Sequence, residues 1–294
     1  MSIAVCLAFF SPCDYALPKQ HLAATLEWLA GQAVQAALAQ VVRPGQEPQP
    51  VPSGITSLVY ESSDVMFFKE CLLNLAAASV DADKLLFLDA DLRFSAEDVI
   101  EQADRLLDDV DVCQPFGTAV WHDRDGKLTL ARRSAAFALS RDYEPLSRYY
   151  HPGFAWGMTR RAFQFLGGFY DRHILGGGDI ALAYSLHPRF VHVDLRARNP
   201  DDAHFATTPS YETYRHRGVS LALRIGCLEN VDCHHRWHGD TVHRQYCHRG
   251  KYLPLEPGDE YRVHARPDGL LAWDNPDDSE RVAAYFRSRQ EDGA

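Results

Sequence analysis

Two carboxylates follow directly after an apolar run in the first third of the chain. Residues 85–88 read Leu-Leu-Phe-Leu, and Asp89 and Asp91 come next with a single residue between them. An apolar run of this length predicts a buried strand, and in an open α/β sheet ligands gather at the carboxyl ends of the strands. Two acids at such an edge can share a hard divalent cation, the charge partner that a diphosphate needs. The alternative is an ordinary acidic turn, because residues 95–98 (Ser-Ala-Glu-Asp) have the pattern of a capping box for a following helix.

Another acid, Asp179, stands at the start of a predicted helix over residues 180–186. It follows three glycines, Gly176, Gly177 and Gly178. Glycine lets backbone approach a ligand closely, and the positive end of the helix dipole favours an ionised carboxylate. The pattern indicates a ligand-binding turn. A plain helix cap is the alternative for Asp179, since Asp is a favoured cap residue.

Histidines are concentrated in residues 233–248, which include His235, His238 and Arg244. An imidazole nitrogen beside carboxylates suits Mn²⁺ better than Mg²⁺, because Mg²⁺ prefers oxygen ligands and water. Two other interpretations are a surface histidine cluster and a structural zinc site made of Cys233, His235 and Cys247. The spacings of that second set match no common zinc motif.

Strand and helix patterns alternate through the first 115 residues and predict a mostly parallel sheet with helices on both faces. Prolines between residues 44 and 52 indicate a surface connector, and residues 121–148 indicate an irregular excursion over the surface. We expect strands at residues 3–10, 55–60, 85–88, 110–114 and 151–158, and helices at 17–40, 64–78, 96–107, 159–166, 180–186 and 279–289.

Composition narrows the class of protein. With 294 residues and 46% hydrophobic content the chain can bury a full core, and we expect one domain over residues 1–250 with an extension, residues 251–294, wrapping it. The net charge of −10 disfavours broad binding to nucleic-acid backbones or anionic membranes. The apolar run at residues 3–10 is too short to span a bilayer, and seven cysteines without framework spacing suit a reducing compartment. A cytoplasmic location is therefore expected.

Residues 59–93 resemble a unit of the metal-dependent glycosyltransferases of the GT-A fold, especially β-1,4-galactosyltransferases and related bacterial or phage-borne enzymes. The resemblance runs from about residue 1 to 250. Its residues in register are Asp64, Phe67, Lys69, Leu72, Leu73, Asn74, Asp89 and Asp91. The implied fold is the α/β GT-A fold, with a mostly parallel central sheet and a C-terminal extension.

The resemblance also implies a site for a nucleotide-sugar donor. Phe67 would pack on a uracil, although core packing is its alternative. Lys69 would serve the diphosphate, and Asp89 would contact the ribose or the sugar. We expect Phe10 and Ser11, where the first strand breaks, and Asn74 to belong to this site, with Arg244 closing over the phosphates.

The implied metal ligands are Asp91 and, from a later segment, His238 and His235. They would hold Mn²⁺ or Mg²⁺, which neutralises the diphosphate as the glycosidic bond breaks. His238 is the stronger candidate of the two histidines.

The implied general base is Asp179, because a hydroxyl acceptor must lose its proton as it attacks the anomeric carbon. The family pattern here has two tryptophans and Gly-Gly-Glu-Asp, whereas this chain has Ile174 and Leu175, and Gly178 stands in place of the Glu. Gly177, Gly178 and Trp156 are the expected acceptor contacts, with core packing as the alternative for Trp156.

The function that these residues favour is Mn²⁺-dependent transfer from a UDP-sugar to a hydroxyl acceptor with inversion. The acceptor stays open among a glycan, a lipid-linked sugar, a protein and a modified nucleic-acid base. One alternative is a non-catalytic, metal-bound module that binds a nucleotide sugar or a partner. Another is a haloacid dehalogenase-type phosphatase, which needs Thr or Val where this chain has Arg93.

Overall fold

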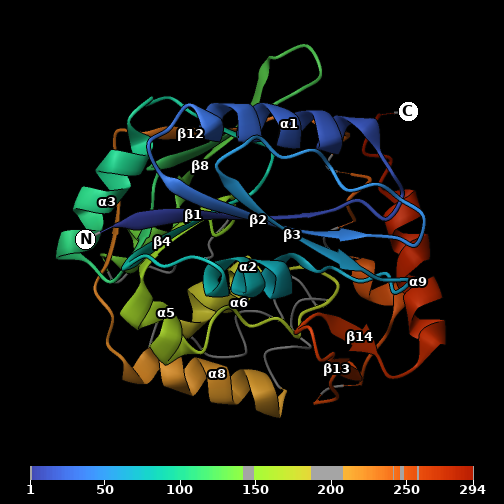
Figure 1. Ribbon diagram of the computed structural model, residues 1–294. Coiled ribbons are helices and arrows are strands. Elements are labelled where there is room, and N and C mark those ends of the chain that lie inside the picture. Colours follow the sequence, from blue (N-terminus) through green and yellow to red (C-terminus); the bar gives the residue numbers. More distant parts are fainter. Residues whose placement is uncertain are drawn as a thin grey trace.

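A seven-stranded sheet forms the centre of the molecule (Figure 1), and the computed structural model describes residues 2–141, 149–186, 208–240, 242–245, 248–256 and 258–293. The strand order is β11-β6-β10-β4-β1-β2-β3, and β10 alone runs antiparallel to its neighbours. The strands are β1 (Ile3–Phe10), β2 (Gln35–Val42), β3 (Ile55–Glu61), β4 (Lys84–Leu88), β6 (Val112–Gln114), β10 (Ala155–Thr159) and β11 (Ile225–Cys227). The expected α/β class with a mostly parallel sheet is confirmed.

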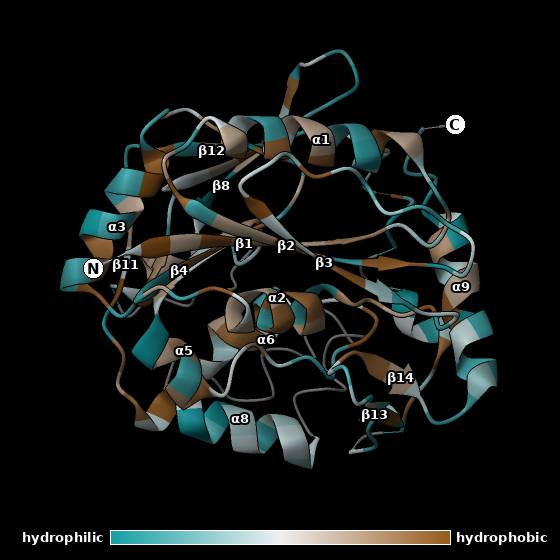
Figure 2. Cartoon of the chain, in the orientation of Figure 1, coloured by the Kyte–Doolittle hydropathy of each residue, from teal (hydrophilic) through white to brown (hydrophobic). Residues whose placement is uncertain are grey.

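Helices cover both faces of this sheet, and each face has its own buried cluster. In β4, Leu86 and Leu88 pack under α1 and α3, while Leu85 and Phe87 pack under α2, α5, α6 and α8, because successive side chains of a strand point to opposite faces. Figure 2 shows apolar residues along the central strands and hydrophilic residues on the outer helices α3 and α8. These helices are α1 (Ala16–Ala30), α2 (Lys69–Ala78), α3 (Val99–Asp109), α5 (Arg160–Leu166), α6 (Gly178–Ser185) and α8 (Pro209–Ser220).

A second, five-stranded sheet has the order β5-β12-β7-β8-β9 and joins the histidine-rich segment to the acid-tipped strand. β12 runs antiparallel to β5, with His235 opposite Leu92, and parallel to β7. The sheet therefore brings residues beyond 230 back beside Asp91. Its elements are β5 (Leu92–Phe94), β7 (Thr118–His122), β8 (Leu128–Ser134), β9 (Tyr150–His151) and β12 (Asp232–His235), and the short helix α4 (Ala135–Leu139) follows β8.

The C-terminal residues pack into the same buried cluster as α2. This region comprises the 3-10 helix η2 (Arg249–Tyr252), the hairpin of β13 (Val263–Ala265) and β14 (Leu271–Trp273), and helix α9 (Pro276–Ser288). The Trp273 indole donates to the carbonyl of Val65 at 3.0 Å. Beyond α9, the Asp292 carboxylate accepts from the amides of Ala16 and Leu17 at the start of α1. The segment after α9 is thereby tied to the start of α1.

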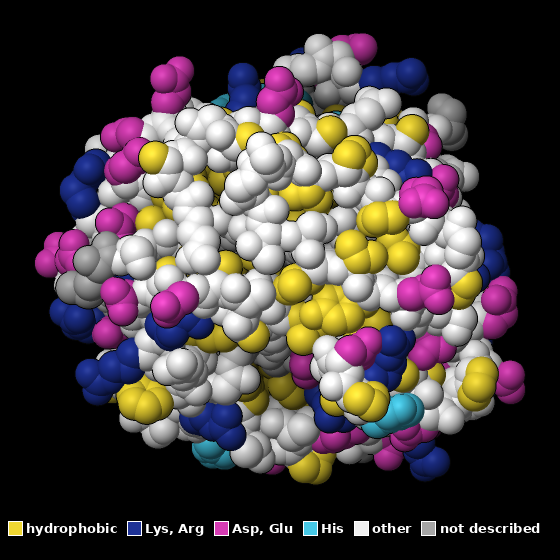
Figure 3. Space-filling model, in the orientation of Figure 1, with side chains coloured by type: hydrophobic (Ala, Val, Ile, Leu, Met, Phe, Trp, Pro, Cys, Tyr) yellow, Lys and Arg dark blue, Asp and Glu magenta, His cyan; other side chains and the backbone are white. Residues whose placement is uncertain are grey.

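Acidic and basic side chains lie side by side over the face shown in Figure 3. Among the described residues, no helix has the length and apolar character to cross a membrane.

The long helix expected at residues 17–40 is wrong in its second half. Helix α1 ends at Ala30, where the Gly31 amide closes the last turn, and β2 follows from Gln35. Residues 36–40 are buried as a continuous run, since β2 is covered on both faces. Such a run shows no alternation in the sequence, and Val34 and Leu38 happened to continue the helical spacing.

Two further expectations need correction. Residues 121–148 contain the hairpin of β7 and β8 and helix α4, not only irregular chain, although residues 142–148 lie outside the described part. The proposed capping box does not form: helix α3 starts at Val99, and the Ser95 hydroxyl instead accepts from the amide of Asp232 at 2.9 Å. Ser95 thus helps to join β5 to β12.

Loss of side-chain volume from β4 should destabilise the sheet that presents the acids. We expect Leu86→Ala, at a fully buried position, to lower the free energy of unfolding by about 2–5 kcal/mol, measured by urea denaturation. Leu128→Ala is the matched control, because Leu128 is 57% exposed and should change the free energy by about 0.5 kcal/mol or less. Equal losses in the two variants would contradict the placement of β4 in the core.

Candidate functional site

The turn between β4 and β5 is fixed by hydrogen bonds from three other parts of the fold. The Asp89 amide donates to the carbonyl of Phe154, and the Arg236 amide donates to the carbonyl of Asp91 at 2.8 Å. The hydroxyl of Thr25, on α1, donates to the carbonyl of Ala90. With its backbone held on three sides, the turn presents the two carboxylates in defined directions.

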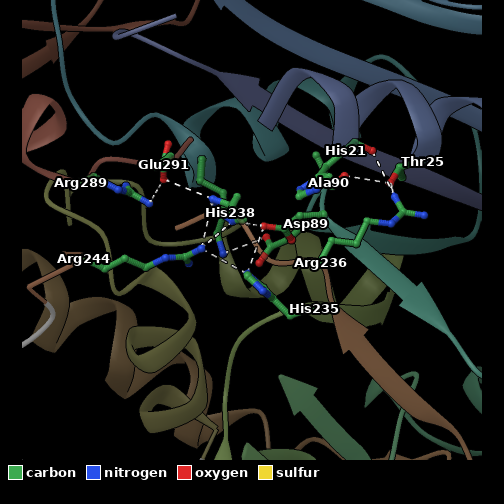
Figure 4. A network of polar contacts seen from close by, with 12 residues as sticks. His21, Thr25, Asp89, Ala90, His235, Arg236, His238, Arg244, Arg289 and Glu291 are labelled. Atoms are coloured by element: carbon green, nitrogen blue, oxygen red, sulfur yellow. Dashed lines mark hydrogen bonds and ion pairs between the residues drawn. The ribbon is translucent and has the colours of Figure 1, made fainter. Parts of the chain in front are cut away.

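Asp91, His235 and His238 meet in one cluster, and Figure 4 shows the two histidines with the polar residues around them. The Oδ2 atom of Asp91 lies 2.7 Å from Nε2 of His238 and 3.3 Å from Nε2 of His235, and the potential ligand atoms of the three residues all lie within 4.8 Å of one another. Both histidines are buried, with under one tenth of each residue exposed. Residues that are 147 positions apart in the sequence, Asp91 and His238, are thus in contact.

The donor atoms of this cluster fit a divalent cation. Burial, followed by the charge of Arg244, lowers the pKa of His238 to about 4, so its imidazole is neutral and has a lone pair that a metal would take in place of the Arg244 guanidinium. Burial alone would raise the pKa of Asp91, but the two histidines offset it and the pKa lies well below its ordinary value. The buried Oδ1 of Asp91 has no hydrogen-bond partner among the described residues. One oxygen and two nitrogen donors suit Mn²⁺.

A guanidinium and a second carboxylate surround His238. Nη2 of Arg244 lies 2.6 Å from Nε2 of His238 and 3.4 Å from Nε2 of His235. On the other side of the ring, Oε1 of Glu291 lies 3.6 Å from Nδ1, and Arg289 pairs with Glu291 at 2.6 Å (Figure 4). A carboxylate hydrogen-bonded behind a ligating imidazole fixes its orientation, and Glu291 lies near that position. Arg244, which was expected over phosphates, lies against the two imidazoles in this structure.

Lys69 joins the two acidic turns. Its Nζ lies 3.1 Å from Oδ1 of Asp89 and 3.0 and 2.9 Å from the two carboxylate oxygens of Asp179. Glu70, the next residue, is 2% exposed, and a Cβ atom on Gly178 would lie 2.1 Å from its Oε1. Three acids, Asp89, Asp179 and Glu70, therefore lie around Lys69.

The raised pKa values of Glu70 and Asp89 indicate more negative charge around Lys69 than this one lysine balances. Burial, against the charge of Lys69, raises the pKa of Glu70 to about 8 and that of Asp89 to about 7, and the neighbouring carboxylates add to both. Although burial acts to lower it, the pKa of Lys69 is well above its usual value because of Asp179 and Asp89. A divalent cation beside Asp91 would add the positive charge that the cluster lacks.

The loop that carries Asp179 is anchored by two residues that were expected in the donor site. Asn74 forms two hydrogen bonds with the backbone of Phe169, and the Phe67 amide donates to the carbonyl of Ile174. Asn74 thus fixes the chain between α5 and α6. Gly177 has φ 106°, and a Cβ there would lie 2.5 Å from the His173 ring, so protein atoms fill the space beside it. Gly178 likewise makes room for Glu70.

Trp156 does not present a face to a ligand. It is 2% exposed on β10, and its indole nitrogen donates to the carbonyl of Pro152 at 2.7 Å. The expectation that it stacks on a sugar is wrong, and its alternative, core packing, holds because β10 lies inside the central sheet.

Phe67 belongs to a half-buried aromatic group at the end of β1. Its ring meets Phe10 edge-on at 5.1 Å and stacks on Phe286 of α9 at 6.3 Å and 20°. The Arg289 guanidinium lies 5.9 Å from the Phe67 ring centre. Ser11, beside Phe10, has a buried hydroxyl without a hydrogen-bond partner among the described residues. The group could hold a planar base, and α9 supplies part of it.

The sequence did not single out several residues that line this region. His151 is one: a Cβ on Gly153 would lie 2.9 Å from its Nε2 and 3.2 Å from Oδ2 of Asp179, so the two side chains are close together. Burial lowers the pKa of His151 well below its usual value. Four other residues near the site were not predicted: Glu70, Glu291, Phe286 and Arg289. Only Glu70 had a signal in the sequence, because it is an acid directly beside Lys69. Cys247, considered for zinc, lies outside the described residues.

Comparisons with known proteins give similarity to solved structures. No family model matches the chain, and no curated protein sequence matches it. S. aureus TarS (residues 1–349) in complex with UDP-GlcNAc is similar with a TM-score of 0.43 and 10% identity, over 63% of this chain and 52% of that one. A Pyrobaculum calidifontis mannosyltransferase in complex with GDP-Man and Mn²⁺ gives 0.41 and 16%, over 74% and 69%. The catalytic domain of Drosophila β1,4-galactosyltransferase 7 gives 0.36 and 13%, over 62% and 59%.

The match spans about half of the length of the TarS chains. The likeness is one of structure at low sequence identity.

The raised pKa of Glu70 should make stability fall with rising pH. Its folded pKa of about 8 exceeds its unfolded value, so the stabilisation is complete below about pH 4.5 and is lost as pH rises toward 8. We expect the free energy of unfolding to drop over that window, and Glu70→Gln to remove a part of the drop on the order of a few kcal/mol. Glu280→Gln, on the exposed side of α9, is the control. An unchanged slope in Glu70→Gln would contradict the buried, protonated state.

Proposed function

We propose that this chain is a metal-dependent glycosyltransferase that moves a sugar from a nucleotide-diphosphate sugar, with a UDP-sugar as donor, to a hydroxyl acceptor. One observation carries the proposal: the Asp91, His235 and His238 cluster lies beside the Lys69, Asp89 and Asp179 cluster at the ends of the central strands. A metal group and a positioned carboxylate in one place are what transfer from a diphosphate leaving group requires.

Each side chain has a definite task in this proposal. Asp91, His235 and His238 would hold Mn²⁺, which supplies positive charge for the leaving diphosphate. Lys69, with its pKa raised, stays protonated and holds Asp89 and Asp179 in fixed positions. The aromatic group around Phe67 would receive the base of the donor. The partial exposure of Phe67 supports this placement.

Asp179 is the proposed general base. The acceptor hydroxyl oxygen forms a bond to the anomeric carbon while its proton passes to a carboxylate oxygen of Asp179. The bond from that carbon to the diphosphate oxygen breaks, and the nucleoside diphosphate leaves with the electron pair. A single displacement of this kind inverts the anomeric configuration. Two hydrogen bonds from Lys69 orient the carboxylate for this transfer.

Loss of the metal ligands should remove metal-dependent donor binding. In isothermal titration with UDP, we expect Mn²⁺ to tighten binding to the unaltered protein, and Asp91→Asn or His238→Gln to lose about tenfold or more of that gain. Asp240→Asn is the control, since Asp240 is exposed in the same segment and should bind as the unaltered protein does. If the unaltered protein bound no UDP- or GDP-sugar with Mn²⁺ and turned none over, the proposed function would be wrong.

Replacement of the base should separate chemistry from donor binding. Asp179→Asn should lower sugar release from the donor by about 10²–10⁴-fold, because the proton acceptor is gone. Its Mn²⁺-dependent affinity for UDP should stay close to that of the unaltered protein, which titration measures on the same sample. Full turnover in Asp179→Asn would exclude Asp179 as the base while leaving the metal site untouched.

A further inference from the structure

A cavity of about 710 Å³ lies beside strand β12, next to the Asp91 cluster. It is bordered by β5, β12, the turn between β7 and β8, the start of α1 and Trp237. His234 and His235 are neighbours on β12, where successive side chains point to opposite faces of the sheet. His234 stacks on His122 in the cavity lining. His235 contacts Asp91 and also borders the cavity, so the cavity adjoins the proposed metal cluster.

Positive charge dominates the lining of the cavity. Arg93, Arg124 and Arg236 come from three different segments, and the two acids of the lining are turned toward backbone amides. Asp292 accepts from the first amides of α1, and Asp123 accepts from the amides of Asp125 and Lys127 in the β7–β8 turn. The chain as a whole has a net charge of −10, and the face in Figure 3 carries both acidic and basic side chains. A lining with three arginines contrasts with this background.

The arginines keep donors available. Nη1 of Arg236 donates to the carbonyl of His21 and the hydroxyl of Thr25, which fixes the guanidinium at the cavity wall. Within the described part of the chain, no ion pair is formed by Arg93 or Arg124. The planar fork of arginine donors matches the oxygens of a phosphate.

Two imidazoles and an indole complete the lining. The rings of His122 and His234 stack at 5.3 Å and 18°, and the buried Nδ1 of His234 has no hydrogen-bond partner among the described residues. The Trp237 ring lies 5.8 Å from the Arg124 guanidinium, at the side of the cavity. An indole face there offers stacking to a ring that carries the anionic group.

We propose that this cavity binds a phosphate monoester, with the phosphate held by Arg93, Arg124 and Arg236 and the attached ring on Trp237. A phosphorylated sugar and a nucleoside monophosphate share this chemistry. The three arginines are not part of the proposed donor site, although His235 borders both, and the proposal does not rest on the proposed transferase activity.

The test is isothermal titration of the full chain without divalent metal, using inorganic phosphate, glucose 6-phosphate and AMP as probes. At least one ester should bind more tightly than inorganic phosphate, and the ester that does so identifies the source of the phosphate. The double variant Arg93→Gln with Arg124→Gln should bind that ester about tenfold or more weakly. Both positions are exposed, so the variant should keep the melting temperature of the unaltered protein.

Matched controls separate this site from net charge and from the donor site. Arg105→Gln with Arg281→Gln removes the same charge from exposed positions on α3 and α9 and should leave ester binding unchanged. Asp91→Asn should also bind the ester unchanged, even if it loses Mn²⁺-dependent UDP binding. Trp237→Ala should weaken ester binding but leave inorganic phosphate unchanged.

The proposal is overturned if no probe binds at millimolar concentration, or if the Arg93 and Arg124 variant binds the ester as tightly as the unaltered protein. An unchanged ester affinity in Trp237→Ala overturns the placement of the ring.

Discussion

The antiparallel pairing of β12 with β5 is the constraint on which the site depends. Its register sets His235 opposite Leu92, the residue after Asp91, and the Arg236 amide closes the ladder on the carbonyl of Asp91. This short ladder joins two segments that are far apart in the sequence. Without it, Asp91 would lack His235 and His238, and His238 would have no fixed partner.

Electrostatics explains why the remaining polar residues are arranged as they are. Burying carboxylates together is unfavourable unless cations or protons compensate. Here Lys69 compensates Asp89 and Asp179, and Glu70 is raised to a pKa at which it keeps its proton at neutral pH. Asp91 is compensated separately by the histidine side of the cluster. Because Lys69 and the histidines compensate different acids, additional positive charge is favourable at the proposed metal position.

The sequence was informative where a single segment decides the structure. Strand β1 and the apolar strand before Asp89 were predicted within a residue, because each is a run with a clear end. The meeting of Asp91 with His238 was expected only through a family resemblance, since nothing in either segment specifies the other. The sequence of β2 continues the helical pattern of residues 17–40, because burial on both faces removes the alternation that marks a strand.

Residues that act through long-range packing could not be found in the same way. Phe286 lies in an ordinary amphipathic helix, and Arg289 and Glu291 follow that helix. Their importance comes from where α9 docks, against Phe67 and His238. The same holds for Trp156, whose type suits a sugar site but whose strand lies inside the sheet. Side-chain type indicates possible chemistry, and exposure decides whether it is available.

Strand β12 also limits how the sequence can change. Because side chains alternate, its neighbouring positions serve different tasks: His235 contacts Asp91, whereas His234 stacks on His122 in the arginine-lined cavity, which His235 also borders. A slip of one residue in the β5–β12 register would exchange the two histidines and dismantle both arrangements at once. The Ser95 hydroxyl, which accepts from the Asp232 amide at the start of β12, holds the register at its open end. A polar contact that seemed to belong to a helix cap thus has its effect on the alignment of the site.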